Sequence, residues 1–138
     1  MSSKIEIEVN SNSYIVNSGL HDATIENINV NCVENSKRVS VECRAEDGRL
    51  FTLDFNDVVF FDINFLGRQN VIRDITVLSK KSAKKFLSEI SNLESYTFHK
   101  IDDLELEIIS GELTFVQFSA SVGADLRIIC KKIEMSSI

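Results

Sequence analysis

The stretch of sequence that decides the fold lies between Leu20 and Val77, and its centre, residues 39–55, reads VSVECRAEDGRLFTLDF. Apolar and polar residues alternate on both sides of Asp47-Gly48. Alternation of this kind is typical of a strand with one buried face, and Asp-Gly between two such runs is a strong signal for a β-hairpin. We expect a type I′ turn there, with positive φ at both central positions.

The same period of two recurs over most of the chain. Outside the central stretch it predicts a first strand at Ile5–Val9 and later strands at 104–109, 113–122 and 124–133. Two dipeptides that end in glycine, Ser110-Gly111 and Val122-Gly123, are expected to be the hairpin turns between the last three strands. The apolar phase changes near Glu26-Asn27 and again between Phe115 and Val116, and a change of phase within one run predicts a β-bulge at each place.

Residues 82–94 break the alternation. Ser82 is a residue type that caps helices, and the apolar residues that follow it have helical spacing. They are Ala83, Phe86, Leu87, Ile90 and Leu93. We therefore expect a mainly β (α+β) fold: an antiparallel β-sandwich or half-open barrel of about eight strands, with one helix near 82–94. The length of 138 residues predicts a single domain, 1–138.

The charge balance narrows the classes of partner. Fifteen basic residues stand against twenty-one acidic ones, which gives a net charge of −6. A protein that binds the phosphate backbone needs a surplus of Lys and Arg, so we do not expect a nucleic-acid partner. No apolar run has the length of a membrane span and the start of the chain lacks the apolar core of a signal peptide, so we expect a cytoplasmic protein that does not enter a membrane.

Three cysteines, Cys32, Cys43 and Cys130, are in phase with apolar neighbours and have no metal-binding spacing. Cysteine packs as a small hydrophobe, so we expect buried free thiols. A Cys32–Cys43 cross-strand disulfide is the alternative, which a reducing cytosol disfavours.

Two groups of polar residues are candidates for chemistry. His21-Asp22 pairs an imidazole with a carboxylate, but neighbours on an extended chain point to opposite faces, so we expect a turn at the entry to a strand. Asp54, Asp57 and Asp62 match no calcium-loop spacing, so we expect solvated carboxylates there. We predict no catalytic residue, no metal ligand, no cofactor and no enzymatic activity.

An acidic stretch follows the predicted helix. Asp102, Asp103, Glu105 and Glu107 lie together there, with no basic residue between them. Ordinary solvent exposure or protection of a strand edge would explain them. They are also our candidate contact for a protein partner, because a negative surface speeds encounter with a positive one.

Part of the chain resembles a known group of proteins. The motifs are Leu20-His21-Asp22-Ala23, the Asp47-Gly48 hairpin with its returning strand Phe51–Phe55, and Gln69–Ile75, in that order. Over residues 20–77 the chain is similar to small bacterial β-rich proteins, many of which are thought to be immunity proteins of polymorphic or contact-dependent toxin systems. The resemblance implies a protein that binds and neutralises a cognate toxin domain, such as a basic nuclease, and it supplies no catalytic residues.

Two other functions are consistent with the sequence. One is a structural or adaptor β-domain that binds another protein or associates with itself through an exposed edge strand. In solution we expect the protein to be a monomer or a homodimer. The other is a small ligand-binding barrel lined by some of the nine Phe residues. Few polar or small residues interrupt the inward phase, so we expect a filled core rather than a ligand cavity.

Overall fold

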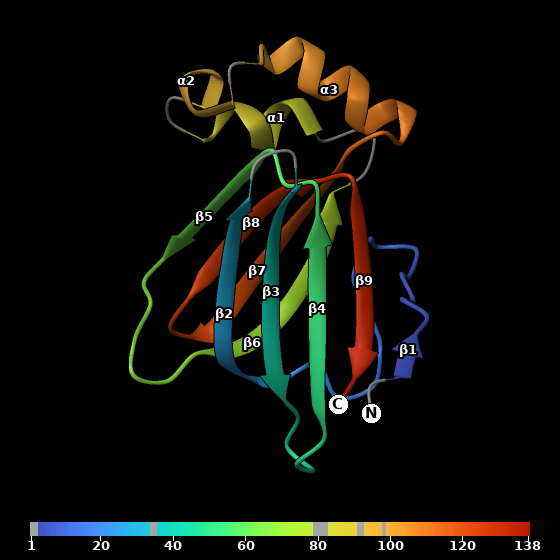
Figure 1. Cartoon of the computed structure of the whole chain (residues 1–138), viewed down its shortest axis with the longest axis vertical. Helices are drawn as coiled ribbons and strands as arrows, with labels where there is room; N and C mark the ends of the chain where they lie inside the picture. Colours follow the sequence, from blue (N-terminus) through green and yellow to red (C-terminus); the bar gives the residue numbers. More distant parts are fainter. Residues whose placement is uncertain (1–2, 34–35, 79–82, 91–92, 98) are drawn as a thin grey trace.

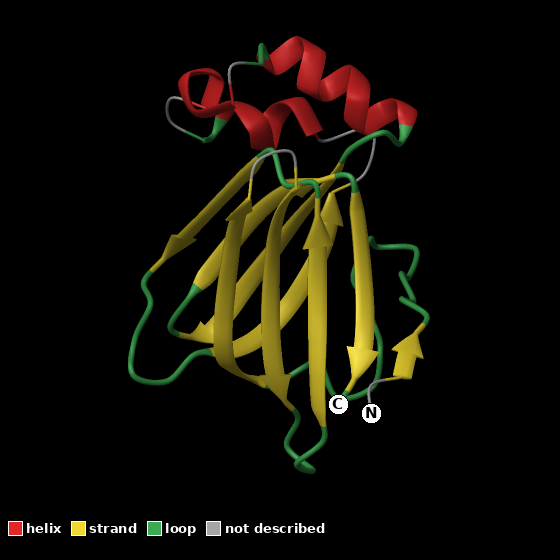
Figure 2. Cartoon of the chain, in the orientation of Figure 1, coloured by secondary structure: helices red, strands yellow, loops and turns green. Residues whose placement is uncertain are grey.

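The structure is a computed structural model that describes residues 3–33, 36–78, 83–90, 93–97 and 99–138. Its body is one antiparallel sheet of nine described strands, and three short helices cover one end of it (Figures 1 and 2). The strands are β1 (Ser3–Ile5), β2 (Thr24–Val33), β3 (Ser36–Arg44), β4 (Leu50–Asn56), β5 (Phe60–Asn64), β6 (Val71–Leu78), β7 (Thr114–Val122), β8 (Asp125–Cys130) and β9 (Lys132–Ser137). The helices are α1 (Ala83–Ser88), α2 (Leu93–Thr97) and α3 (Ile101–Ser110). The predicted mainly β fold is confirmed, with nine strands in place of about eight.

The sheet bends back on itself at β2. Its strand order is β1-β9-β4-β3-β2-β6-β7-β8-β5, and in Figure 1 the strands from β9 to β2 form a front wall that β6, β7, β8 and β5 cross obliquely from behind. The strand pairing that joins the two walls is short, because β2 pairs with β6 only at Thr24↔Val71. A register shift between Ile25 and Asn27 marks the corner, so the bulge predicted near Glu26-Asn27 is confirmed. After the corner, the second half of β2 pairs only with β3.

The segment before β2 closes one side of this half-open barrel. The first strand ends at Ile5 rather than running to Val9, and β1 pairs with β9. The chain then forms bridges at Val9↔Ile15 and Tyr14↔Thr76, the second of which reaches β6 in the other wall. On the opposite side β5 ends the sheet, and no described strand joins its outer edge to β2. The barrel is therefore open between β2 and β5.

Apolar side chains fill the space between the two walls. The largest of them are fully buried, and Phe55 and Phe118 meet edge to face with ring centroids 5.9 Å apart. The interior is a packed core, as its uninterrupted apolar phase predicts.

The helical layer differs most from the sequence-based expectation. Helix α1 and helix α2 occupy the region where a single helix was expected at 82–94, and Ser82 lies outside the described residues. The strand predicted at 104–109 is wrong: these residues belong to α3, and Gly111, expected in a hairpin turn, is the C-cap of that helix with φ 87°. The expected helix positions do bury their apolar face, in a second cluster that joins the helices to the ends of the strands. That cluster includes Phe60, Leu78, Ala83, Leu87, Ile90, Leu93, Leu104, Ile108, Phe115 and Ile129.

This second cluster also explains why the bulge predicted between Phe115 and Val116 is wrong. The register of β7 on β6 is continuous there, with Leu78↔Phe115 followed by Val77↔Val116. Both residues are buried because Phe115 faces the helices while Val116 faces the core between the walls. Two adjacent apolar residues here indicate a strand covered on both faces.

The central hairpin is present, but its turn differs from the expected type. Only Gly48 has positive φ (90°), and Ala45 N–H donates to the Arg49 carbonyl, so the loop has three residues. A left-handed glycine at the end of such a loop is the usual alternative to the two-residue turn.

None of the described helices has the length and apolar content that crossing a bilayer requires.

Candidate functional site

The acidic residues predicted to contact a partner lie on α3, not on a strand (Figure 1). Leu104 and Ile108, one helical turn apart, are buried against the second cluster, so the rest of the helix faces outward. Asp102 and Asp103 are exposed, and Glu105 and Glu107 are half-buried on its flanks. Edge protection is thus not the role of these residues, because no strand edge lies there.

Helix α3 also exposes two apolar side chains beside the carboxylates. Leu106 is 64% exposed and Ile109 is 38% exposed. Asp102, Leu106 and Ile109 follow one another at spacings of four and three, which places them on one side of a helix. We call the surface formed by Asp102, Asp103, Leu106 and Ile109 the α3 face. The sequence reasoning missed its apolar part, because Leu106 was placed on a strand.

Two contacts join the start of α3 to the other two helices. Lys100, the N-cap residue, makes no capping hydrogen bond with its side chain, and instead Glu94 Oε2 of α2 accepts a hydrogen bond of 2.8 Å from Ile101 N–H. Lys84 Nζ of α1 lies 3.1 Å from Asp102 Oδ1. This hydrogen bond, with the charges of Asp102 and Glu105, raises the pKa of Lys84. Carboxylates in the first turn are also favoured by the helix dipole.

His21 and Asp22 come together in a way that the sequence reasoning excluded. His21 Nδ1 lies 3.0 Å from Asp22 Oδ2. The chain is not extended here, because Asp22 has φ 66° and Ala23 N–H donates to the Leu20 carbonyl across a turn. The predicted turn is confirmed, but the argument that the two side chains point apart is wrong.

The three aspartates considered as a cation site are not assembled. Asp54 accepts a hydrogen bond from Ser40, and Asp62 pairs with Arg127 of β8. Within the described ranges no group of three or more His, Cys, Asp or Glu side chains is arranged to hold a metal ion.

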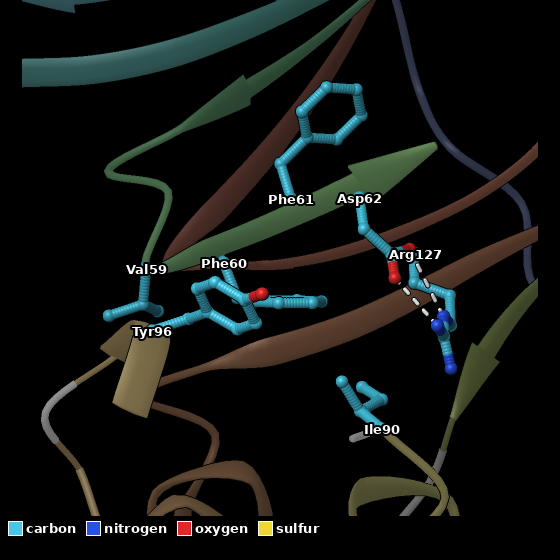
Figure 3. A pocket seen from close by; sticks show the side chains of 7 residues that line it. All are labelled: Val59, Phe60, Phe61, Asp62, Ile90, Tyr96 and Arg127. Atoms are coloured by element: carbon cyan, nitrogen blue, oxygen red, sulfur yellow. Dashed lines mark hydrogen bonds and ion pairs between the residues drawn. The ribbon is translucent and has the colours of Figure 1, made fainter. Parts of the chain in front are cut away.

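The Asp62–Arg127 pair lies in a hollow that the sequence reasoning did not find (Figure 3). Arg127 Nη2 and Nε reach the two oxygens of Asp62 at 2.6 and 3.1 Å, a bidentate geometry. The hollow has a volume of about 390 Å³, and its other walls are aromatic and aliphatic. Tyr96, 68% exposed, leans over Phe60 with ring centroids 6.4 Å apart. Asp62 and Arg127 are both in the outward phase of their strands, but nothing in the sequence indicates that β5 pairs with β8.

The thiols divide into two kinds. Cys43 and Cys130 are buried and free, as expected, and burial raises the pKa of each to about 12. Cys32 is exposed, which contradicts the prediction, because the half of β2 that carries it borders the open side of the barrel. The alternative of a Cys32–Cys43 disulfide is also wrong, since Cys32 lies opposite Lys37 and Cys43 opposite Ile25.

Comparison of the chain with protein-family models, with curated proteins and with solved structures gave no match.

Proposed function

We propose that this protein is a non-catalytic, immunity-type protein that binds and neutralises a cognate bacterial toxin domain, and that a basic nuclease domain is the kind of toxin it fits. The observation that carries the proposal is the α3 face. Helix α3 has four carboxylates and no basic residue in ten positions, and it exposes Leu106 and Ile109 beside Asp102 and Asp103. The net charge of −6 and the resemblance of residues 20–77 to immunity proteins support the same function.

The chemistry of the α3 face suits a basic partner. Protein interfaces combine an apolar centre with a polar or charged rim, and a few well-packed residues supply most of the affinity. Leu106 and Ile109 would supply the apolar centre. The carboxylates around them would attract a basic surface over distance and speed association, an effect that salt weakens. A nuclease domain has such a surface, because it must bind phosphates.

The test begins with the product of the adjacent gene. Its toxin-like domain should bind this protein in calorimetry, and co-expression of the two should restore the growth of bacteria that the domain alone inhibits. Replacing Asp102 and Asp103 together by Lys should weaken binding by about tenfold or more, because close charge pairs at interfaces contribute strongly. The matched control is Glu6→Lys/Glu46→Lys, which makes the same change in net charge on two exposed residues, one directly after β1 and one in the β3–β4 hairpin, at the far end from the helices (Figure 1).

Two negative outcomes have different meanings. If the neighbouring gene encodes no toxin-like domain, or the purified domain does not bind, the proposed function fails. If the domain binds and Asp102→Lys/Asp103→Lys weakens binding no more than Glu6→Lys/Glu46→Lys does, the function stands and the α3 face is the wrong surface.

A further inference from the structure

Among the described strands, β5 is the less protected of the two edges of the sheet. It pairs with β8 on one side and ends the strand order on the other. Exposed edges attract other chains, and natural proteins usually protect them with charge, proline or short length. The opposite edge follows this habit, because β1 has only three residues and carries Lys4. β5 has five residues, three of them apolar, and its one charge, Asp62, is already bound by Arg127.

Two hollows flank β5, and Val59, Phe60 and Phe61 line both of them. The hollow of about 390 Å³ lies on the face of Phe60 and Asp62, as Figure 3 shows, where Phe61 points the other way. On the face of Phe61 a second hollow of about 210 Å³ runs to the second half of β2. We call this second hollow the inner groove. A strand that paired with β5 would direct its side chains alternately to the two faces, and so into the two hollows.

Exposed apolar side chains continue this surface. Val30, 49% exposed, lines the inner groove from β2. Phe65 and Leu66 directly follow β5 and are 79% and 64% exposed. Phe65 has φ 63°, an uncommon conformation for a bulky residue, and such conformations often mark functional positions. The open side of the barrel therefore carries apolar area beyond the two hollows.

The net charge of the residues that line the two hollows is positive, whereas the net charge of the whole chain is negative. Lys37 is in the same phase as the buried Val39, yet it is exposed, because it lies at the mouth of the inner groove. Among the described residues that line the two hollows, Lys37, Arg38 and Arg127 are cations, and Asp62 alone is an anion. In a protein of net charge −6 this local excess of cations favours an acidic occupant.

From these observations we infer that the outer edge of β5 binds an extended acidic segment of another protein by β-strand addition. Main-chain hydrogen bonds to β5 hold the segment, its alternate apolar side chains fill the two hollows, and carboxylates at the end that lies nearer β3 meet Lys37 and Arg38. The site lies apart from the α3 face and does not rest on the proposed toxin binding.

The probe is a short capped peptide in which valine and tyrosine alternate between glutamates at both ends. It should cause saturable shifts in the amide NMR signals of residues 60–64, Val30 and Lys37, and should slow hydrogen exchange in β5. The same peptide with lysine ends should bind about five- to tenfold more weakly, as expected for a few exposed charge pairs. The peptide is also made in two N-methylated forms, one methylated at the odd and one at the even residues. One of the two should not bind, because only the N–H groups of alternate residues face β5 and complete the hydrogen-bond ladder.

Variants of the protein provide a second measurement. Val30→Glu should weaken binding of the peptide by about tenfold, because it places a carboxylate in the inner groove. Val122→Glu is its control, since Val122 has a similar exposure of 52% and lines neither hollow. Lys37→Glu should also weaken binding of the peptide, and it should do so more than its control, Lys85→Glu on α1. A bulky maleimide on Cys32, which lines the inner groove while the other two thiols are buried, should block the peptide.

Several results would overturn the inference. These are no shift in β5 with the glutamate peptide, equal binding of the lysine-ended peptide, full binding of both N-methylated peptides, and equal effects of Val30→Glu and Val122→Glu. Shifts in residues 60–64 that depend on protein concentration in the absence of peptide would show that the edge pairs with a second copy of this chain instead.

Discussion

The Asp62–Arg127 pair is the residue-scale contact whose strength is easiest to test. It is bidentate, and its side chains are only 28% and 25% exposed. Arg127→Met should lower the free energy of unfolding by about 1–3 kcal/mol, because it leaves a half-buried carboxylate without its partner. Urea unfolding measures the loss. The control is Lys84→Met, which removes a single contact between exposed groups and should leave the urea midpoint unchanged. Equal shifts in the two variants would contradict this assignment.

The two buried thiols make stability depend on pH in a defined window. Burial, the largest cause, raises the pKa of Cys43 and Cys130 from 9.0 to about 12. Between pH 9 and 12 the unfolded chain therefore loses two protons that the folded chain keeps. The free energy of unfolding should fall as pH rises through this window, by up to about 1.4 kcal/mol per pH unit for each thiol, and the thiols should have no effect below it.

Urea unfolding from pH 8 to 11 measures this slope. Because Lys and Tyr also titrate there, the comparison is between variants. Replacing Cys43 and Cys130 by Ala should flatten the slope even though it lowers stability overall. An unchanged slope in the double variant would show that the buried thiols do not titrate as their burial requires.

At the scale of elements, the sequence predicts an element well where its apolar residues fit only one period. In β3 and β4 the buried positions alternate strictly, and both strands were predicted. In α3, Leu104, Leu106 and Ile108 have the period of a strand, while Leu104 and Ile108 also have the spacing of a helix. The helix forms because a second core at the end of the barrel buries Leu104 and Ile108 and leaves Leu106 outside. That core is tertiary information, which a local pattern does not contain.

For the candidate sites too, the sequence predicts the local features but not those that depend on tertiary structure. The four carboxylates between residues 102 and 107 indicate an exposed surface from the sequence alone, and these four residues are indeed exposed or half-buried. Which residues lie beside these carboxylates depends on whether the segment is a strand or a helix. The helix places the exposed Leu106 and Ile109 beside them. The hollows beside β5 depend on long-range pairing of β5 with β8, so no local motif could have predicted them.

Gly111 and Gly123 allow a test of turns at the element scale. Both have positive φ, 87° and 84°, but their surroundings differ. A methyl group on Gly111 would meet nothing within 4 Å, whereas on Gly123 it would collide with Asn70 Oδ1 and the Gln69 carbonyl. Asn70 cannot easily move, because its Oδ1 accepts hydrogen bonds of 3.0 Å from the N–H groups of Gly67 and Ala124.

Gly111→Ala should therefore cost about 1 kcal/mol, the backbone penalty alone. Gly123→Ala should cost about 3 kcal/mol or more, because the loop that Asn70 holds must also shift. Thermal and urea unfolding of the two variants measure the difference. Equal losses would mean that the β5–β6 loop yields without cost, and that Asn70 does not fix it.

At the scale of the whole molecule, the two ends of the chain complete the barrel together. β1 pairs with β9 through Ser3↔Ser137, and β9 lies between β1 and β4 (Figure 1). Pairings this distant in sequence close only after most of the chain is ordered, because the entropy of closing long loops opposes them earlier. The topology therefore predicts folding in milliseconds to seconds, the range usual for β proteins of similar architecture.

The chain contains no proline, so this topological step should also be the slowest step of refolding. Isomerisation of X–Pro bonds, which adds phases of about 10–100 s to many proteins, is absent here. In double-jump experiments followed by far-ultraviolet circular dichroism, the refolding amplitudes should not depend on the time spent unfolded, and a prolyl isomerase should not change the rates. A phase lasting minutes that grows with the unfolding delay would contradict this prediction. A slow phase that grows with protein concentration would instead indicate association during folding, and β5, the less protected edge, is where Val30→Glu and Phe65→Glu should then suppress it.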